Sequence, residues 1–260
     1  MRRLIPIIYC TLLMLFCAVS TAQEAGNKDI KPANAPAPVI PKVLIIPPEK
    51  KMYMSDIDRS INKETQMSVP KIRDAFRTGL DNQLVFKFKP TYRVISLLKD
   101  SVKSQKDLQF IYRSVSYKYS LTSGKEKPED QKNITNGQIT TPTHGDEERY
   151  MRVSINQPGL LEAMHKKYGA ELFVFISEID LKGALSSDPV PTREAWIHFT
   201  TYNLQGVQVG GGLAKAKFDP GLNDPKKISS QVLSVAAKII YSRSIIPAPV
   251  PDNKTPVKGH

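Results

Sequence analysis

The sequence predicts an α/β (α+β) fold: a single mixed-sheet sandwich with amphipathic helices packed on it and a C-terminal β-hairpin plus helix. Two observations support this prediction. A helical pattern beginning at Leu160 reaches Gly169 and runs into an unbroken apolar segment, residues 172–176, which is typical of a buried central strand. Further on, two alternating segments, 194–203 and 207–218, flank a short glycine-containing turn, as in a β-hairpin.

The N-terminus has the pattern of a secretory signal peptide. Arg2 and Arg3 precede an apolar run over residues 4–19, and small residues follow at 20–22. The run has about 16 residues, whereas a membrane-spanning helix needs about 20. We therefore expect cleavage of residues 1–22 and export of the remaining chain.

Both cysteines, Cys10 and Cys17, lie within this segment, so we expect no disulfide, thiol nucleophile or thiolate metal site after cleavage. Lipidation would use Cys17, but Phe16 is bulky where a lipoprotein signal needs a small residue. Cleavage removes two of the 37 basic residues and none of the 25 acidic ones, which leaves a net charge near +10. This balance suits an anionic glycan or lipid surface, and it serves solubility equally well.

The rest of the chain divides by composition. Residues 23–41 are rich in proline and alanine and predict a spacer. The α/β domain is expected over residues 42–242, with an exposed loop at about 121–147, where proline and glycine recur without an apolar period. Residues 243–260 predict a disordered, proline-rich tail.

The first half of the domain begins with a short apolar strand at residues 43–46 and a polar, charged loop at 49–66. Ser68 and Pro70 then open a helix, with serine as the cap and proline in the first turn. A strand at 92–98 follows this helix. The apolar stripe of the helix comprises Ile72, Ala75, Phe76, Gly79, Leu80 and Leu84.

A second helix is predicted over residues 107–119, and a strand over 149–155 precedes the central helix. Three consecutive glycines, Gly210 to Gly212, predict a bulge or a close backbone approach within the hairpin. Asp224 and Pro225 begin the last helix as cap and first helical residue. Its predicted buried face comprises Ile228, Val232, Val235, Ala236 and Ile239.

The loop at residues 49–66 holds the candidate contact residues. Asp56 and Asp58 stand two apart, so in an extended loop both carboxylates would face a calcium ion or a glycosidic bond. An EF-hand needs further oxygen ligands, a glycine and a closing glutamate, none of which is in place. No metal site is therefore predicted, and loop capping or salt bridging is the preferred interpretation. The full candidate set is Tyr53, Ser55, Asp56, Asp58 and Arg59.

Common catalytic signatures are absent from the sequence. No histidine pair has zinc-hydrolase spacing and no G-x-S-x-G elbow exists, so we predict no catalytic residue and no cofactor. Aromatic and basic residues alternate at 110–113 and 117–119, a pattern compatible with stacking on bases or sugars. A helix face with core aromatics is the preferred interpretation, and an exported protein rarely meets nucleic acid.

The order of the predicted helices and strands is similar to that of a known group of proteins. The segment KKYGAELFVFISEID, the early VLIIP strand, the amphipathic helix, the hairpin and the final helix together resemble a group of bacterial envelope proteins. The group includes the curli-secretion lipoprotein CsgG, the amino-terminal domain of TolB and the activators of penicillin-binding proteins. The segment KMYMSDIDR also resembles uncharacterised secreted proteins of Bacteroidetes. The chain departs from the curli protein in lacking a convincing lipobox.

Together these features predict an exported, non-catalytic envelope protein that binds an envelope protein or a cell-wall component. The expected location is the periplasm or the outer membrane, with the extracellular space as a further possibility. One alternative is a hydrolase of an envelope polymer that uses Asp56 or Asp58. Another is binding to anionic glycan or lipid through the positive net charge.

Overall fold

The computed structural model describes residues 40–99, 101–122, 133–135, 138–140, 148–184 and 190–245. The predicted signal peptide, most of the spacer and the tail from residue 246 lie outside these residues. Across the described ranges, no helix combines the length and the apolar character that a membrane crossing requires.

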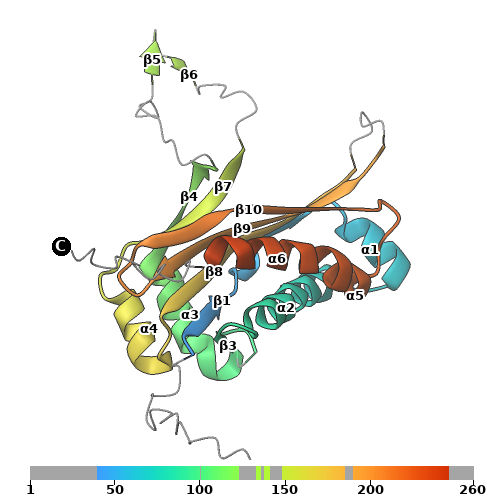
Figure 1. Cartoon of the computed structure of the whole chain (residues 1–260). Coiled ribbons are helices and arrows are strands. Elements are labelled where there is room, and N and C mark those ends of the chain that lie inside the picture. The colour runs from blue at the N-terminus through green and yellow to red at the C-terminus, as the bar shows by residue number, and fades with distance from the viewer. Residues whose placement is uncertain are drawn as a thin grey trace, which may run out of the picture. The chain divides into compact units, whose positions relative to one another are not determined.

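A six-stranded mixed sheet forms the centre of the domain (Figure 1). Its order is β10 (Gln208–Phe218), β9 (Arg193–Asn203), β8 (Leu172–Lys182), β1 (Lys42–Ile46) and β3 (Arg93–Ser96). The short strand β2 (Tyr53–Ser55) pairs with β8 beyond the end of β1. Strands β1, β2 and β3 run parallel to their neighbours, whereas β9 and β10 are antiparallel. The predicted mixed-sheet α/β fold is confirmed.

Helices α2 (Val69–Phe88) and α6 (Leu233–Ser244) lie side by side on one face of the sheet (Figure 1). On the other face, α3 (Ser101–Ser114), α4 (Leu160–Tyr168) and strand β7 (Arg149–Ile155) cover a second apolar cluster. Neighbouring side chains on β1 alternate between the two clusters because strand residues alternate in direction. Both faces of β1 and β8 are therefore buried.

Strand β7 pairs through its backbone with β4 (Val115–Leu121) on one edge only. Side chains of the central sheet bond its other edge, so the strand is not left with exposed edge groups. We call these four hydrogen bonds the β7 docking bonds. They are Met151 N–H to His198 Nδ1 (2.8 Å), Val153 N–H to Thr200 Oγ1 (3.0 Å), Tyr202 O–H to the Val153 carbonyl (2.6 Å) and Ser177 O–H to the Met151 carbonyl (2.5 Å).

Several predicted elements are confirmed. Helix α4 ends at Gly169 with a φ of 69°, the left-handed conformation expected of a glycine cap. The hairpin β9–β10 turns at Gly206, and a register irregularity lies between Gln208 and Gly210. A Cβ on Gly210 would stand 2.2 Å from the Arg243 carbonyl oxygen, so the predicted close backbone approach is also confirmed.

The helix predicted over residues 107–119 is wrong in its second half. Helix α3 ends at Ser114, and β4 begins at the next residue. Val115, Tyr117 and Tyr119 alternate, and they pair with β7. Tyr117, for example, lies opposite Val153, 36 residues further along the chain. This long-range pairing overrides the local helical pattern.

The segment predicted as a loop at 49–66 is structured. It contains a 3₁₀ turn (Lys50–Met52), β2 and helix α1 (Asp58–Thr65). Ile57 and Ile61 are four residues apart and both fully buried, so one helical turn anchors α1 in the core. Of the loop predicted at 121–147, the structure describes its first two residues and a short antiparallel pair, β5 (Asn133–Thr135) and β6 (Gln138–Thr140).

The buried face predicted for the last helix is partly wrong. Asp224 accepts hydrogen bonds from two backbone N–H groups, as a cap should, and α5 (Pro225–Lys227) follows. A π-helical turn (Ile228–Val232) then precedes α6. A π turn holds more residues per turn than an α-helix and so rotates the face that follows. Val235 is exposed as a result, and the buried residues of α6 are Leu233, Ala236, Ala237, Ile240 and Ser244.

Candidate functional site

The five residues predicted as a contact loop divide between structural and exposed positions. Tyr53 donates a hydrogen bond to Asp58 Oδ1 (2.6 Å), and its ring stacks on Phe76. Asp58 is only 9% exposed. Burial, with a contribution from Asp58, raises the pKa of Tyr53. This pair therefore holds β2 and α1 together inside the domain.

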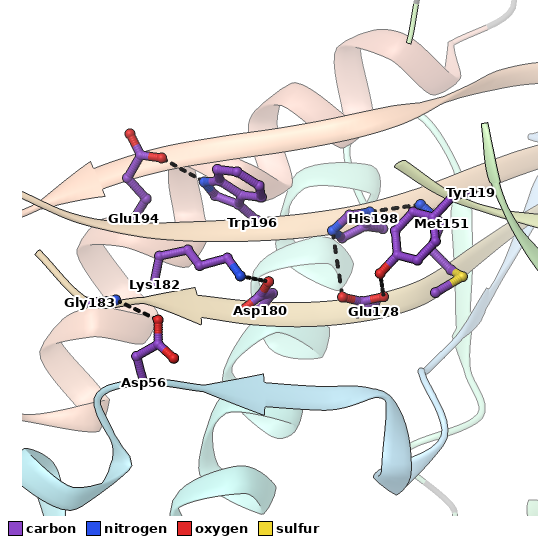
Figure 2. Close-up of polar contacts among 10 residues, drawn as sticks. All are labelled: Asp56, Tyr119, Met151, Glu178, Asp180, Lys182, Gly183, Glu194, Trp196 and His198. Atoms are coloured by element: carbon purple, nitrogen blue, oxygen red, sulfur yellow. Dashed lines mark hydrogen bonds and ion pairs between the residues drawn. The ribbon is translucent and has the colours of Figure 1, made fainter. Parts of the chain in front are cut away.

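Ser55 accepts a hydrogen bond from the Ile57 N–H (3.2 Å), which closes the turn before α1. Asp56 is exposed and accepts a bond from Gly183 N–H (3.2 Å) at the end of β8 (Figure 2). Arg59 is exposed on α1. The two aspartates do not face one site, because α1 begins at Asp58 and ends the extended alternation on which the prediction depended.

A pocket of about 580 Å³ lies where β8, β9 and β10 pass beyond the apolar cluster under α3 and α4. We call it the Glu178 pocket. Strand β2 and the β4–β7 pair contribute to its rim. Its lining residues are Met54, Tyr119, Glu148, Arg149, Glu178, Asp180, Lys182, Trp196, His198 and Lys215.

A β-bulge in β8 aims the acidic residues into this pocket. The pairing with β9 shifts register between Ile176 and Glu178, which leaves Ser177 as an extra residue. The shift places Ile179 and Leu181 in the core beneath α2 and α6. Glu178, Asp180 and Lys182 consequently point to the opposite face, where Glu178 lies beside His198 of β9 and Lys182 reaches Asp180 (Figure 2).

His198 lies at the floor of the pocket and is 3% exposed. Its Nδ1 accepts the Met151 N–H bond, so the proton of the neutral ring is on Nε2. That Nε2 has no hydrogen-bond partner and lies 3.9 Å from Glu178 Oε1. Burial, and then the charges of Lys182 and Lys215, lower the pKa of His198 to about 4. The imidazole is therefore neutral at pH 7.

Glu178 is 1% exposed and accepts one hydrogen bond from the Tyr119 hydroxyl, at 3.2 Å (Figure 2). Burial raises the pKa of Glu178, while the Tyr119 hydrogen bond counteracts this shift. Partial desolvation of its hydroxyl, together with the charge of Glu178, raises the pKa of Tyr119 to about 12. Tyr119 thus keeps its proton and acts as a donor on the carboxylate.

Two ion pairs also line the pocket. Lys182 Nζ lies 2.6 Å from Asp180 Oδ2, and Lys215 contacts Glu148. Both lysines also lie against Trp196, with Lys215 Nζ 4.2 Å from the ring centroid. Counting Arg149, the lining holds three carboxylates and three cations, so with a neutral histidine its formal charge is zero.

The arrangement provides fixed donors and acceptors but no assembled nucleophile. Ser177 directs its hydroxyl to the Met151 carbonyl, so it is not paired with His198 as a base. Within the described ranges, no three His, Cys, Asp or Glu residues are grouped so as to hold a metal ion. The pocket is a concave site with convergent polar groups.

Sequence reasoning missed Glu178 and His198. Alternating charged residues at 178, 180 and 182, directly after an apolar run, were the available signal for one polar sheet face. Whether they faced solvent or core depended on the bulge at Ser177. None of the five predicted contact residues is among the lining residues of the pocket, although Met54, which lies between Tyr53 and Ser55, is one of them.

No family model matches the chain, and no curated protein matches its sequence. The crystal structure of lipoprotein GNA1162 from Neisseria meningitidis has a TM-score of 0.33 to this chain at 9% sequence identity. The match covers 71% of this chain and 87% of that one. A likeness at this level does not transfer a fold, a location or an activity to this protein.

Proposed function

We propose that this chain is an exported, non-catalytic envelope protein that binds an envelope protein or cell-wall component through the Glu178 pocket. Export rests on the N-terminal order of two arginines, an apolar run and small residues. The observation that carries the binding role is the pocket floor. There the buried imidazole N–H of His198, which has no partner, lies beside the buried Glu178 carboxylate, and both residues line the pocket.

Burying polar groups without full hydrogen bonding costs free energy, on the order of 1–3 kcal/mol for each group. An unsatisfied buried group in a native structure therefore calls for an explanation, and a ligand that supplies the missing bonds provides one. The candidate contact segment joins this surface through Met54, which is 44% exposed at the pocket rim.

The hydrolase alternative has less support. Asp58 is engaged by Tyr53, and Asp56 accepts a backbone bond from Gly183, so the two carboxylates are not arranged around one substrate. Binding of an anionic surface through net charge stays a separate proposal, because the lining of the Glu178 pocket is electrically balanced.

Site-specific photo-crosslinking in living cells tests the binding role. A photoreactive residue at Met54 reports on the pocket rim, and one at Val235 on α6 is the matched control, because the two side chains are 44% and 47% exposed. We expect a defined adduct with one envelope component from position 54 and none from position 235.

Equal labelling from both positions, or no adduct from either, would contradict the proposed surface. Release of soluble fragments from isolated envelopes, lost on Glu178→Gln, would show that the protein is an enzyme and overturn its non-catalytic assignment.

A further inference from the structure

The floor of the Glu178 pocket presents a donor and an acceptor that do not satisfy each other. His198 Nε2 and Glu178 Oε1 are 3.9 Å apart, beyond hydrogen-bonding distance. The donor is fixed as N–H because Nδ1 is held by Met151. A ligand group that satisfies both must therefore accept a hydrogen bond from His198 Nε2–H and donate one to Glu178 Oε1, and its two hydrogen-bonding positions must lie close together.

Charged ligand groups fit this requirement poorly. An ammonium group would donate to Glu178 but would place a positive charge against the Nε2–H dipole. A carboxylate or phosphate would accept from Nε2–H but would stand beside Glu178 and Asp180. A hydroxyl group both accepts and donates, and it replaces a water molecule without loss of hydrogen bonds.

The walls of the pocket repeat the same pairing of donors with acceptors. Asp180 stands with Lys182, and Glu148 stands with Lys215, so each pair offers an acceptor next to a donor. Vicinal hydroxyls of a sugar can bridge such pairs. The formal charge of the lining is zero, which favours an uncharged ligand. Tyr119, with its ring at the rim, adds an apolar surface of the kind on which sugar rings pack.

We propose that the Glu178 pocket binds a neutral saccharide, one hydroxyl of which accepts a hydrogen bond from His198 Nε2–H and donates one to the Glu178 carboxylate. This inference rests on the proposed binding role and names its ligand class. The pocket volume of about 580 Å³ lies within the range of roughly 300–1,000 Å³ that small-molecule sites occupy.

The first measurement applies the protein without residues 1–22 to a microarray of neutral and acidic bacterial oligosaccharides, with free phosphate and a capped tripeptide tested in solution. We expect at least one neutral oligosaccharide to bind. Its titration should shift the His198 Nε2–H resonance in NMR spectra, because that proton gains an acceptor.

Two variants separate the ligand contacts from the fold. In His198→Asn, the side-chain oxygen stands in for Nδ1 and keeps the Met151 bond, while Nε2–H is lost. Glu178→Gln keeps the shape of the side chain but removes its charge. Each should weaken saccharide binding roughly tenfold, the effect of one lost hydrogen bond. Glu171→Gln, at an exposed glutamate just before β8, should bind as wild type does.

The inference fails if no neutral saccharide binds, if only phosphate, acidic glycans or the tripeptide bind, or if all three variants bind alike. If position 54 crosslinks to an envelope protein but no saccharide binds, the saccharide inference is wrong and the proposed binding role is retained. If a saccharide binds but position 54 gives no adduct, the saccharide inference is retained and the proposed binding of an envelope component in the cell is contradicted.

Discussion

At His198 the two ring nitrogens face different parts of the fold. Nδ1 accepts a backbone bond from β7, and Nε2 faces Glu178 across the pocket floor. The groups around the ring are Glu178, Tyr119, Lys182 and Lys215. Protonation would place a second N–H against the Met151 N–H and would break that docking bond. The residue therefore couples the pocket to the position of β7.

The lowered pKa of His198 predicts an acid-sensitive contribution to stability. The unfolded chain binds a proton at this histidine near pH 6.5, whereas the folded chain does so only near pH 4. The stability it contributes is therefore complete above about pH 6.5 and is lost as the pH falls to about 4. The loss should approach about 3 kcal/mol, at about 1.4 kcal/mol per pKa unit.

Urea unfolding measured from pH 7.5 to pH 4 checks this prediction, with His198→Asn as the reference because it keeps the Met151 bond and cannot titrate. The raised pKa of Glu178 acts in the opposite sense, since its protonation in the folded state adds stability as the pH falls, and it is present in both proteins. Parallel pH profiles for the two proteins would contradict the prediction.

Strand β7 is an element held by side chains as much as by backbone pairing. Its partner β4 bonds one edge, and the β7 docking bonds fix the other edge onto β8 and β9. These bonds fix the position of the β4–β7 pair relative to the central sheet. They also place Tyr119 within reach of Glu178. The pocket rim thus depends on polar contacts that lie outside the apolar clusters.

Removing one docking bond should destabilise the domain. Thr200→Val is nearly isosteric and leaves the buried Val153 N–H without its acceptor, which should cost about 1–3 kcal/mol. Thr200→Ser loses only the methyl group and keeps the oxygen, so it should retain more of the wild-type stability. Urea unfolding followed by circular dichroism measures both, and equal losses for valine and serine would show that the hydroxyl is not needed.

At the scale of the whole domain, the two apolar clusters share their central strands. On β1, Val43 and Ile45 belong to the cluster under α2 and α6, while Leu44 and Ile46 belong to the one under α3 and α4. Loss of either cluster would expose one apolar face of β1 to water and so would remove the support that β1 gives to the other cluster. The described domain should therefore unfold as one cooperative unit.

Truncations on the two faces test this cooperativity. Leu80→Ala beneath the sheet and Leu161→Ala on the opposite face each remove a buried side chain, and each should cost about 2–5 kcal/mol. Trp196, the single tryptophan of the chain, reports on the pocket face by fluorescence, and far-ultraviolet circular dichroism reports on the secondary structure. In both variants the two signals should change at the same urea concentration; separate transitions would mean that the faces unfold independently.

The sequence by itself determined the elements whose causes are local. Gly169 ends α4 because glycine accepts a positive φ. The apolar run after it lacks polar alternation, which is the pattern of a strand buried on both faces, and it forms β8. The hairpin turn at Gly206, the cap at Asp224 and the first helical residue Pro225 follow from turn and cap chemistry within a few residues.

Tertiary structure alone decided what depends on distant partners. Pairing with β7 ended α3 at Ser114, the π turn at residues 228–232 rotated the buried face of α6, and the extra residue Ser177 turned Glu178 out of the core. A shift of one residue in a strand reverses every side chain beyond it, and no local pattern records such a shift. For that reason His198 and Glu178, on neighbouring strands, form a pocket that only the paired sheet brings together.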